Sequence, residues 1–220
     1  MNSAAEPHGR VRSITVEGTG RARVEPDEAV VELGVLVMRP SATEARDHAA
    51  AQMTRVVEAL RDAGTEERDL RTSSLSLSPT YEHRPNGSAR RIGYEVANRV
   101  TATVRRLDSL ASLVDAAIAA GATSLDGVAF RRADESGAEG EALRRAIAAA
   151  RAKALAVAEA ASLALGPVES VEEAGGVTPH PGPRLMRMEA LAVADTPVMG
   201  GSMEIVRSVR VAFRIADEDA

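Results

Sequence analysis

The stretch LRTSSLSLSPTYEHRPNGSARRIGYEVANRVTATVRR, residues 70–106, contains two alternating runs of apolar and polar residues around a turn signal. In the second run the apolar side chains recur at every other position, and they are Ile92, Tyr94, Val96, Val100, Ala102 and Val104. The first run is weaker, and its apolar residues are Leu75, Leu77 and Tyr81. A period of two predicts half-buried β-strands. Asn86-Gly87 lies between the runs and predicts a tight hairpin, because both residues tolerate the positive φ of such a turn.

The same kind of pattern outside this hairpin predicts further strands and three helices. The strands are expected at residues 13–17, 28–37, 125–130, 168–171 and 204–215, and the helices at residues 41–63, 108–121 and 136–165. Gly18-Thr19-Gly20 is expected to form a bulge or turn after the first strand. The resulting order, ββαββαβαββ, is typical of an α+β fold with helices packed on mostly antiparallel sheets.

Local signals set the ends and faces of the helices. Ser41-Ala42-Thr43-Glu44 and Ser136-Gly137-Ala138-Glu139 are both predicted capping boxes. The 108–121 helix is expected to direct Ile118 inward, and the longest helix has a predicted apolar stripe of Leu143, Ile147, Ala150, Ala154, Ala158, Ala161 and Leu165. The acidic stretches at residues 65–69 and 134–141 are expected to be solvated helix starts.

Composition limits the core and the partners. Aromatic residues make up only 2% of the 220 residues, so the core must consist of Val, Leu, Ile and Ala, with helices close to their neighbours. A net charge of −5 and a pI near 5.5 argue against nucleic-acid binding, which needs a concentrated basic surface. The chain has no cysteine, which excludes disulfides, thiolate metal sites and cysteine nucleophiles.

No segment predicts a membrane span or an export signal. Residues 1–12 contain no apolar core of a signal peptide, and no later run approaches the roughly 18 apolar residues of a spanning helix. The chain as written is therefore expected to be soluble and cytoplasmic, or periplasmic or extracellular if its N-terminus is processed. We expect a mobile segment at residues 1–12, an α+β domain at 13–216 and an acidic tail at 217–220. A division of the domain into two halves near Arg106 is left open.

No catalytic constellation is visible in the sequence. Gly18-Thr19-Gly20 lacks the third glycine and the following helix of a dinucleotide-binding turn. The serines of the first hairpin strand are not in a G-x-S-x-G elbow, and the four histidines (His8, His48, His83 and His180) are scattered over a tail, a helix and two loops. The chain is therefore expected not to be an enzyme and to need no cofactor.

A long segment at residues 175–202 is rich in proline, glycine and methionine, which is typical of a functional or assembly loop. Its methionines and the one just after it are predicted interface residues, and they are Met186, Met188, Met199 and Met203. A copper site built from His180 and these thioethers is a weaker alternative.

Several strings, in order and spacing, resemble the SIMPL-domain family. They are Ile14-Thr15-Val16-Glu17-Gly18-Thr19-Gly20, Val24-Glu25-Pro26-Asp27, Thr72-Ser73-Ser74-Leu75-Ser76-Leu77-Ser78-Pro79, Gly93-Tyr94-Glu95-Val96-Ala97-Asn98 and Ala149-Ala150-Arg151-Ala152-Lys153-Ala154. The resemblance spans residues 13–215. It implies an α/β-plait-like fold, frequent export in bacterial members, ring-like or channel-like self-assembly in some members, and an association with oxidative-stress tolerance. Some bacterial members are immunogenic antigens, and the family offers no catalytic motif.

The expected function is that of a non-enzymatic, self-assembling bacterial α+β protein with a stress-protective role. A homo-oligomer is the expected partner state, and a further protein partner is left open. The alternatives are a small-molecule or metal-binding protein and an adaptor for another protein.

Overall fold

A computed structural model describes residues 12–83, 88–174 and 201–216, and it divides them into two compact units. Residues 12–24, 134–174 and 202–216 form the terminal unit, and residues 25–83 and 88–133 form the central unit. Arg106 lies inside the central unit. Four parts of the predicted layout lie outside the described residues: the Asn86-Gly87 turn, residues 1–11, residues 175–200 and the acidic tail.

The predicted order ββαββαβαββ is confirmed, and the fold is α+β. The elements are β1 (Ser13–Val24), β2 (Glu28–Arg39), α1 (Ala42–Asp62), β3 (Leu70–His83), β4 (Ala89–Val104), α2 (Leu110–Ala120), β5 (Ser124–Arg131), α3 (Ser136–Ala160), β6 (Ala164–Glu173) and β7 (Met203–Ala216). Short 3-10 helices at Glu67–Asp69 and Leu107–Ser109 precede β3 and α2. Among the described helices, none has the length and apolar character needed to cross a membrane.

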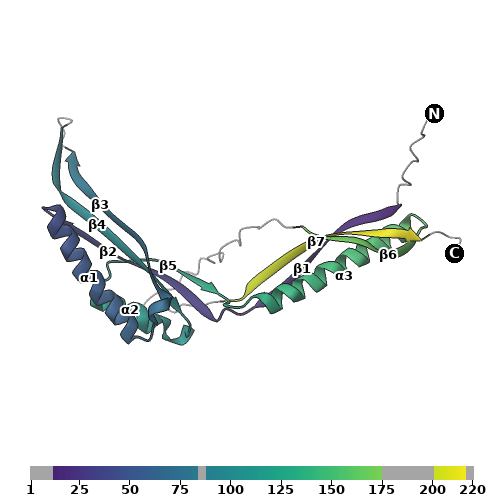
Figure 1. Ribbon diagram of the computed structural model, residues 1–220, viewed down its shortest axis with the longest axis horizontal. Coiled ribbons are helices and arrows are strands. Elements are labelled where there is room, and N and C mark those ends of the chain that lie inside the picture. The colour runs from purple at the N-terminus through teal and green to yellow at the C-terminus, as the bar shows by residue number, and fades with distance from the viewer. Residues whose placement is uncertain (1–11, 84–87, 175–200, 217–220) are drawn as a thin grey trace, which may run out of the picture. The chain divides into compact units, whose positions relative to one another are not determined.

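The central unit is an antiparallel sheet with α1 and α2 on one face (Figure 1). Its strands lie in the order β3-β4-β2-β5. Alternate residues of β2 and β4 face the helices and form the core, and they include Val31, Leu33, Val35, Val96 and Val100. The core is aliphatic, as the near absence of aromatic residues predicts. The other face of the sheet carries no helix in the described part of the chain.

The ends of α1 and α2 follow the predicted signals. The Ser41 hydroxyl accepts a hydrogen bond from the Glu44 N–H at 3.2 Å, which caps α1. Gly121 ends α2 with φ of 114°, a conformation that glycine adopts without strain. The predicted inward position of Ile118 is wrong, because α2 turns Leu110, Leu113 and Ala117 into the core and leaves Ile118 exposed.

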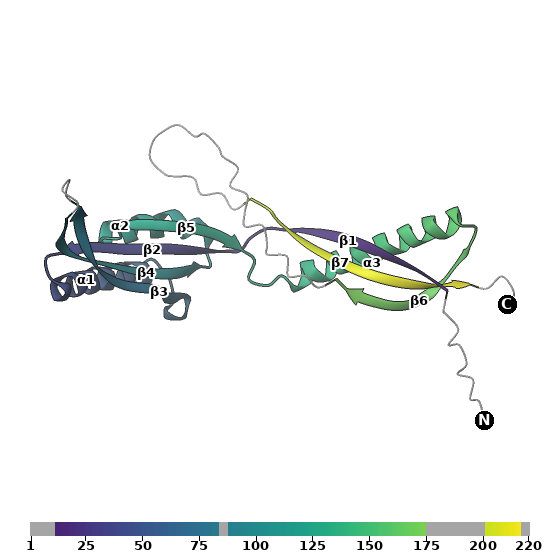
Figure 2. The ribbon, with the colours of Figure 1, turned by 90° about the horizontal axis from the view of Figure 1, so that it is seen from above.

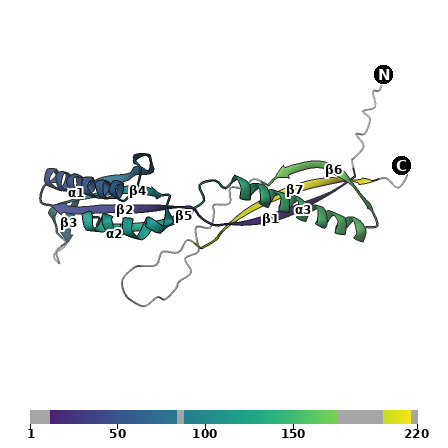
Figure 3. The ribbon, with the colours of Figure 1, turned by 90° about the horizontal axis from the view of Figure 1, so that it is seen from below.

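The terminal unit is a three-stranded sheet in the order β1-β7-β6, with α3 along one face (Figures 2 and 3). The predicted bulge at Gly18-Thr19-Gly20 is wrong, because β1 runs unbroken from Ser13 to Val24 and pairs with β7 throughout. A Cβ at Gly18 would lie 2.1 Å from the Ala146 carbonyl oxygen, and one at Gly20 would lie 2.0 Å from that of Ala142. The glycines therefore let the α3 backbone approach the strand.

The buried face of α3 differs from the predicted stripe. Its buried residues are Ala142, Ala146, Ala150, Ala154 and Ala158, four residues apart, and only the last three belong to the prediction. Ile147 is exposed, and the helix ends before Leu165, which lies in β6. The second capping box is also wrong. Glu135 occupies the N-cap but its side chain does not cap the helix, and the Ser136 N–H donates to the Asp134 carboxylate.

Candidate functional site

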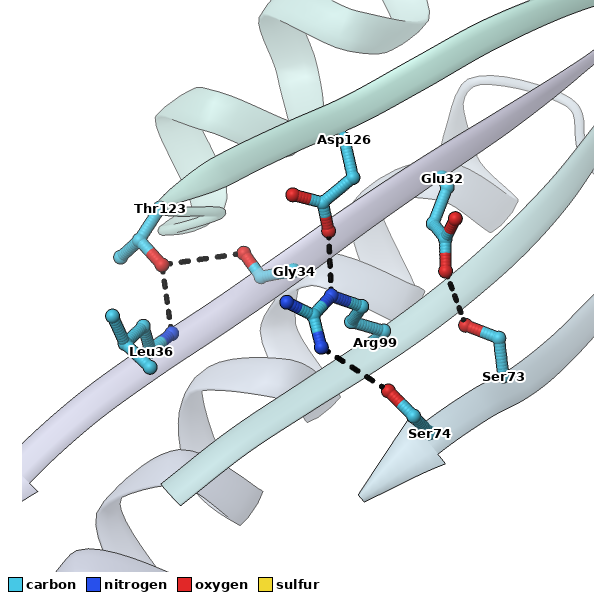
Figure 4. Close-up of polar contacts among 8 residues, drawn as sticks. All are labelled: Glu32, Gly34, Leu36, Ser73, Ser74, Arg99, Thr123 and Asp126. Carbon is cyan, nitrogen blue, oxygen red and sulfur yellow. Dashed lines mark hydrogen bonds and ion pairs between the residues drawn. The ribbon is translucent and has the colours of Figure 1, made fainter. Parts of the chain in front are cut away.

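The open face of the central sheet has a hollow lined by Gly34 of β2, and Figure 4 shows the polar contacts around it. Its volume is about 360 Å³, and residues of β2, β4 and the start of β5 line it. Gly34 lies opposite Arg99 of β4 on one side and Ser124 of β5 on the other. A Cβ at position 34 would lie 2.4 Å from the Ser124 hydroxyl oxygen. Glycine at this point therefore leaves the middle of the sheet face open.

An ion pair crosses the hollow above Gly34. Arg99 of β4 donates from Nε to Asp126 of β5 at 2.7 Å, across the intervening strand β2. The β5 register shifts beside Asp126, because Gly127 lies opposite Glu32 and Leu125 opposite Leu33. Such a bulge re-aims a side chain. Both side chains of the ion pair are partly exposed, so the pair is accessible to a solute.

Hydroxyl groups surround this pair. Arg99 also donates from Nη1 to the Ser74 hydroxyl at 3.4 Å, and its Nη2 makes no hydrogen bond within the described residues. Ser73 donates to the Glu32 carboxylate at 2.9 Å. Two serines from the predicted first hairpin strand are thus hydrogen-bond partners of charged side chains in β2 and β4 (Figure 4). The hollow itself is lined by the Arg99 guanidinium, the Asp126 carboxylate and the hydroxyl residues Thr123 and Ser124.

Thr123 closes one end of the hollow where β5 begins. Its hydroxyl accepts a hydrogen bond from the Leu36 N–H at 2.7 Å and donates to the Gly34 carbonyl at 3.3 Å. β2 continues past this point to Arg39, so Thr123 satisfies backbone groups that β5 no longer reaches. Leu36 and Met38 are exposed on this continuation and add an apolar margin to the hollow.

A second surface of the central unit is apolar. Leu75 and Leu77 lie in β3, opposite Asn98 and Val96, and Ile92 lies in β4 at the register shift between the two strands. Their side chains are 67%, 46% and 44% exposed. α1 lies over β4 and β2 much more than over β3, and the β3–β4 hairpin extends beyond the end of α1 (Figure 1). We name Leu75, Leu77 and Ile92 the β3–β4 patch.

The predicted solvation of residues 65–69 is wrong for two of them. Asp69 is half-buried, with a side chain only 8% exposed, and it accepts two hydrogen bonds from Arg105, at 2.7 Å and 2.9 Å. The hydrogen bond from Arg105 holds the pKa of Asp69 below its ordinary value of 3.8. Thr65 is also buried, and its hydroxyl makes no hydrogen bond within the described residues. Both residues line a smaller hollow of about 180 Å³ near Arg106.

The predicted interface and metal residues lie mostly outside the described residues. Met186, Met188, Met199 and His180 are not among them, so their role stays a prediction. Met203 is the first residue of β7 and pairs with Val24 rather than lying in a loop. His48 is exposed in α1 and His83 ends β3. In the part of the chain that the structure describes, no group of three or more His, Asp or Glu side chains could hold a metal ion.

Comparison with known proteins covers nearly the whole chain. A family model described as "SIMPL: Protein of unknown function (DUF541)" matches residues 14–213. The chain belongs to the SIMPL family. The resemblance inferred from the sequence strings is therefore confirmed. The family description assigns no activity, so it leaves open what the hollow and the β3–β4 patch do.

Relatives in the SIMPL family come from several bacteria. A "26 kDa periplasmic immunogenic protein" of Brucella melitensis is 31% identical over 210 residues, which cover 92% of this chain and 84% of that protein. Its counterpart in Brucella abortus has the same identity and coverage. The "Uncharacterized protein YggE" of Escherichia coli strain K12 is 28% identical over 208 residues, covering 94% and 84%.

Sequence reasoning missed Arg99 and Asp126 as site residues. In the sequence, Arg99 is one of several polar residues in an alternating strand, and Asp126 lies in a short strand with no motif. The available signal was Gly34, which interrupts the β-branched and leucine-rich strand β2. Glycine inside a strand often marks a close approach. That signal indicates a position but not the residues that meet over it.

Proposed function

We propose that this protein is a non-enzymatic, periplasmic module that works as an assembly of its own copies and protects the cell against oxidative stress. The observation that carries the assembly is the β3–β4 patch. Three large aliphatic side chains lie on one hairpin, each more than 40% exposed. Contiguous apolar surface of this kind is usually covered by a partner in the working form of a protein.

Other observations support the remaining parts of the proposal. The printed name of the Brucella relatives, a periplasmic immunogenic protein, supports the periplasm rather than the cytoplasm. The family's association with stress tolerance supports the protective role. The non-enzymatic part rests on the sequence, which contains no nucleophile elbow, no cysteine and no dinucleotide-binding turn.

The function is tested by deletion and complementation in the bacterium that encodes the chain. Loss of the gene is expected to lower survival in hydrogen peroxide, and the wild-type gene is expected to restore it. A variant carrying Leu75→Lys and Leu77→Lys, secreted to the same level, is expected not to restore it. Full restoration by this variant would contradict assembly as the working state. Unchanged survival after deletion would contradict the protective role.

The hollow over Gly34 favours a second candidate function, the binding of a small carboxylate. Arg99 Nη2 makes no hydrogen bond within the described residues, and Arg99 and Ser124 line the same partly enclosed hollow. Guanidinium groups bind carboxylates well because their donors match the carboxylate oxygens. Sodium malonate is expected to raise the thermal unfolding temperature above that in sodium chloride of equal ionic strength, and Arg99→Met is expected to abolish the difference. No difference for the wild-type chain would exclude malonate-like ligands.

A further inference from the structure

β3 is an edge strand that the described residues leave open. It is 14 residues long, and in the described part of the chain no strand pairs with its outer side. From Arg71 to His83 every residue is exposed except Ser74 and Thr80, which are half-buried. Residues 72–80 contain no charged side chain. Natural proteins usually protect such edges with charges, bulges or covering elements, because an open edge pairs with another chain.

The other sheet edges have such protection. On β1, Lys153 donates to the Glu17 carbonyl and Arg145 to the Arg21 carbonyl, each at 2.6 Å, so cations of α3 occupy main-chain acceptors of that edge strand. β6 contains Pro167 and two register shifts against β7. β5 is only 8 residues long. β3 also contains Pro79 and two register shifts against β4, but residues 74–78 between the first shift and the proline pair regularly and carry no charge, so this segment is the part of the edge available for pairing.

The sequence of this edge is nearly the same in both directions. Residues 72–80 read TSSLSLSPT, which is a palindrome about Ser76 with a single mismatch, Ser73 against Pro79. An antiparallel pair of two such strands with a two-fold axis at Ser76 places Leu75 opposite the second copy's Leu77. Ser74 then lies opposite Ser78, and Ser76 opposite itself. A two-fold interface requires a surface that is complementary to itself, and this edge meets that requirement.

The backbone supports the same register. Proline within a sheet is confined to positions where its missing N–H would face away from the neighbouring strand. Pro79 pairs with Tyr94 of β4, so its nitrogen faces the open edge. Leu77 and Leu75 lie two and four residues before Pro79. Because residues two apart in a strand direct their main-chain groups to the same side, the N–H and C=O groups of both leucines also face the open edge. In the proposed pair the main-chain groups of Leu75 and Leu77 hydrogen-bond across the axis, and Ser76 lies in a pair without such bonds. Pro79 has no N–H to donate to the second strand, so regular pairing is confined to residues 74–78.

We propose that β3 pairs antiparallel with β3 of a second copy, about a two-fold axis at Ser76, which joins the two central sheets into one. The four leucines at positions 75 and 77 then form one continuous apolar strip across the interface. Directly opposed side chains in such a pair have Cβ atoms about 4.5–5.5 Å apart, close enough for the leucines to cover one another. The proposal rests on the proposed function, because it names the contact through which the copies assemble.

The absence of cysteine permits a direct test of the register. Residues opposite each other without hydrogen bonds have Cα atoms about 4.5 Å apart, within the range of about 4.4–6.8 Å that disulfides span. Ser76→Cys in the full chain is expected to form a disulfide-linked dimer under mild oxidation. Ser74→Cys and Ser78→Cys are each expected to stay monomeric on a non-reducing gel, and their equimolar mixture is expected to form the dimer. Equal crosslinking by Ser74→Cys alone would overturn the register.

A second set of variants tests the edge without cysteines. Leu75→Lys with Leu77→Lys puts lysine opposite lysine across the proposed pair, at positions that are exposed in the single chain, and it is expected to lower the mass in solution. The matched control is Leu155→Lys, at an exposed leucine of α3, which is expected to keep the wild-type mass. A wild-type chain that is monomeric at every concentration would overturn the proposed assembly itself. An oligomeric wild type whose mass the double variant leaves unchanged, without crosslinking of Ser76→Cys, would overturn only the β3 pairing.

Discussion

Gly18 of β1 lies so close to Ala146 of α3 that a Cβ on the glycine would stand 2.1 Å from the alanine carbonyl oxygen. The same relationship holds two residues further along β1, where a Cβ on Gly20 would stand 2.0 Å from the Ala142 carbonyl oxygen. Five buried alanines, four residues apart, allow this approach along α3. The terminal unit is therefore held by close contact of a helix backbone with a strand backbone rather than by large side chains.

Gly18→Ala is expected to destabilise the protein strongly. The added methyl group meets main-chain atoms, which cannot turn away as a side chain can, so the cost is expected at the upper end of overpacking, about 3 kcal/mol. Urea unfolding followed by circular dichroism measures it. Gly127→Ala in β5 is the matched control, because a Cβ there meets no atom within 4 Å. Equal stability of the two variants would show that α3 does not lie against β1 as described.

Removal of the two cations beside β1 is expected to open a second sheet edge. Arg145→Ala with Lys153→Ala frees the carbonyls of Arg21 and Glu17, and freed edge groups promote pairing with other chains. Light scattering is expected to show species of higher mass than the wild type forms. Arg151→Ala, at an exposed position of the same helix, is expected to leave the mass unchanged. If the double variant also leaves it unchanged, the cations do not protect this edge.

The ion pair of Asp69 with Arg105 is expected to make stability depend on pH. The pKa of Asp69 is lowered in the folded chain by the Arg105 hydrogen bond, so the pair stabilises the fold above the unfolded pKa of about 4 and ceases to do so as pH falls through the folded pKa. Asp69→Asn is expected to lower the urea midpoint at pH 7, and its difference from wild type is expected to shrink toward pH 3. Asp115→Asn in α2 serves as an exposed control. A difference that stays constant down to pH 3 would contradict this linkage.

Gly34→Val is expected to separate Arg99 from Asp126. Its side chain would fill the space over β2, where a Cβ lies 2.4 Å from the Ser124 hydroxyl oxygen. The expected loss in free energy of unfolding is about 1–3 kcal/mol. Gly127→Val in the neighbouring strand is expected to be neutral or stabilising, because valine suits strands and has room there. The loss in free energy of unfolding caused by Gly34→Val should also be measured in the Arg99→Met variant. A smaller loss there than in the wild-type chain would assign part of it to the ion pair, and an equal loss would contradict that assignment.

The order of elements was predictable because each long element has one clear period. The alternation in β2, β4 and β7 and the signals at Ser41 and Gly121 report local backbone preferences, and the structure keeps them. The prediction for Gly18-Thr19-Gly20 is wrong because glycine marks both turns and close approaches, and only the packing of α3 decides between them. The α3 stripe was misread because alanines occupy every face of that helix, so sequence alone does not favour one of them.

The surfaces proposed to function were less predictable than the fold. Leu75 and Leu77 read as buried strand residues, because alternation indicates a face but not whether a helix covers it. The Arg99 and Asp126 pair depends on the bulge in β5 and on Gly34 between them, and both are properties of strand pairing. The self-complementarity of residues 72–80 was visible in the sequence, but it gains meaning only once β3 is known to be an open edge.

The most direct test of self-assembly is the absolute mass of the full wild-type chain in solution, measured by light scattering during size-exclusion chromatography. The chain mass is 23.0 kDa, and pairing through β3 predicts a discrete species of at least twice that mass that persists on dilution. The same elution at high salt is expected, because the proposed contact contains leucines and main-chain hydrogen bonds rather than ion pairs. A mass of 23.0 kDa at all concentrations would contradict assembly as the working state of this protein.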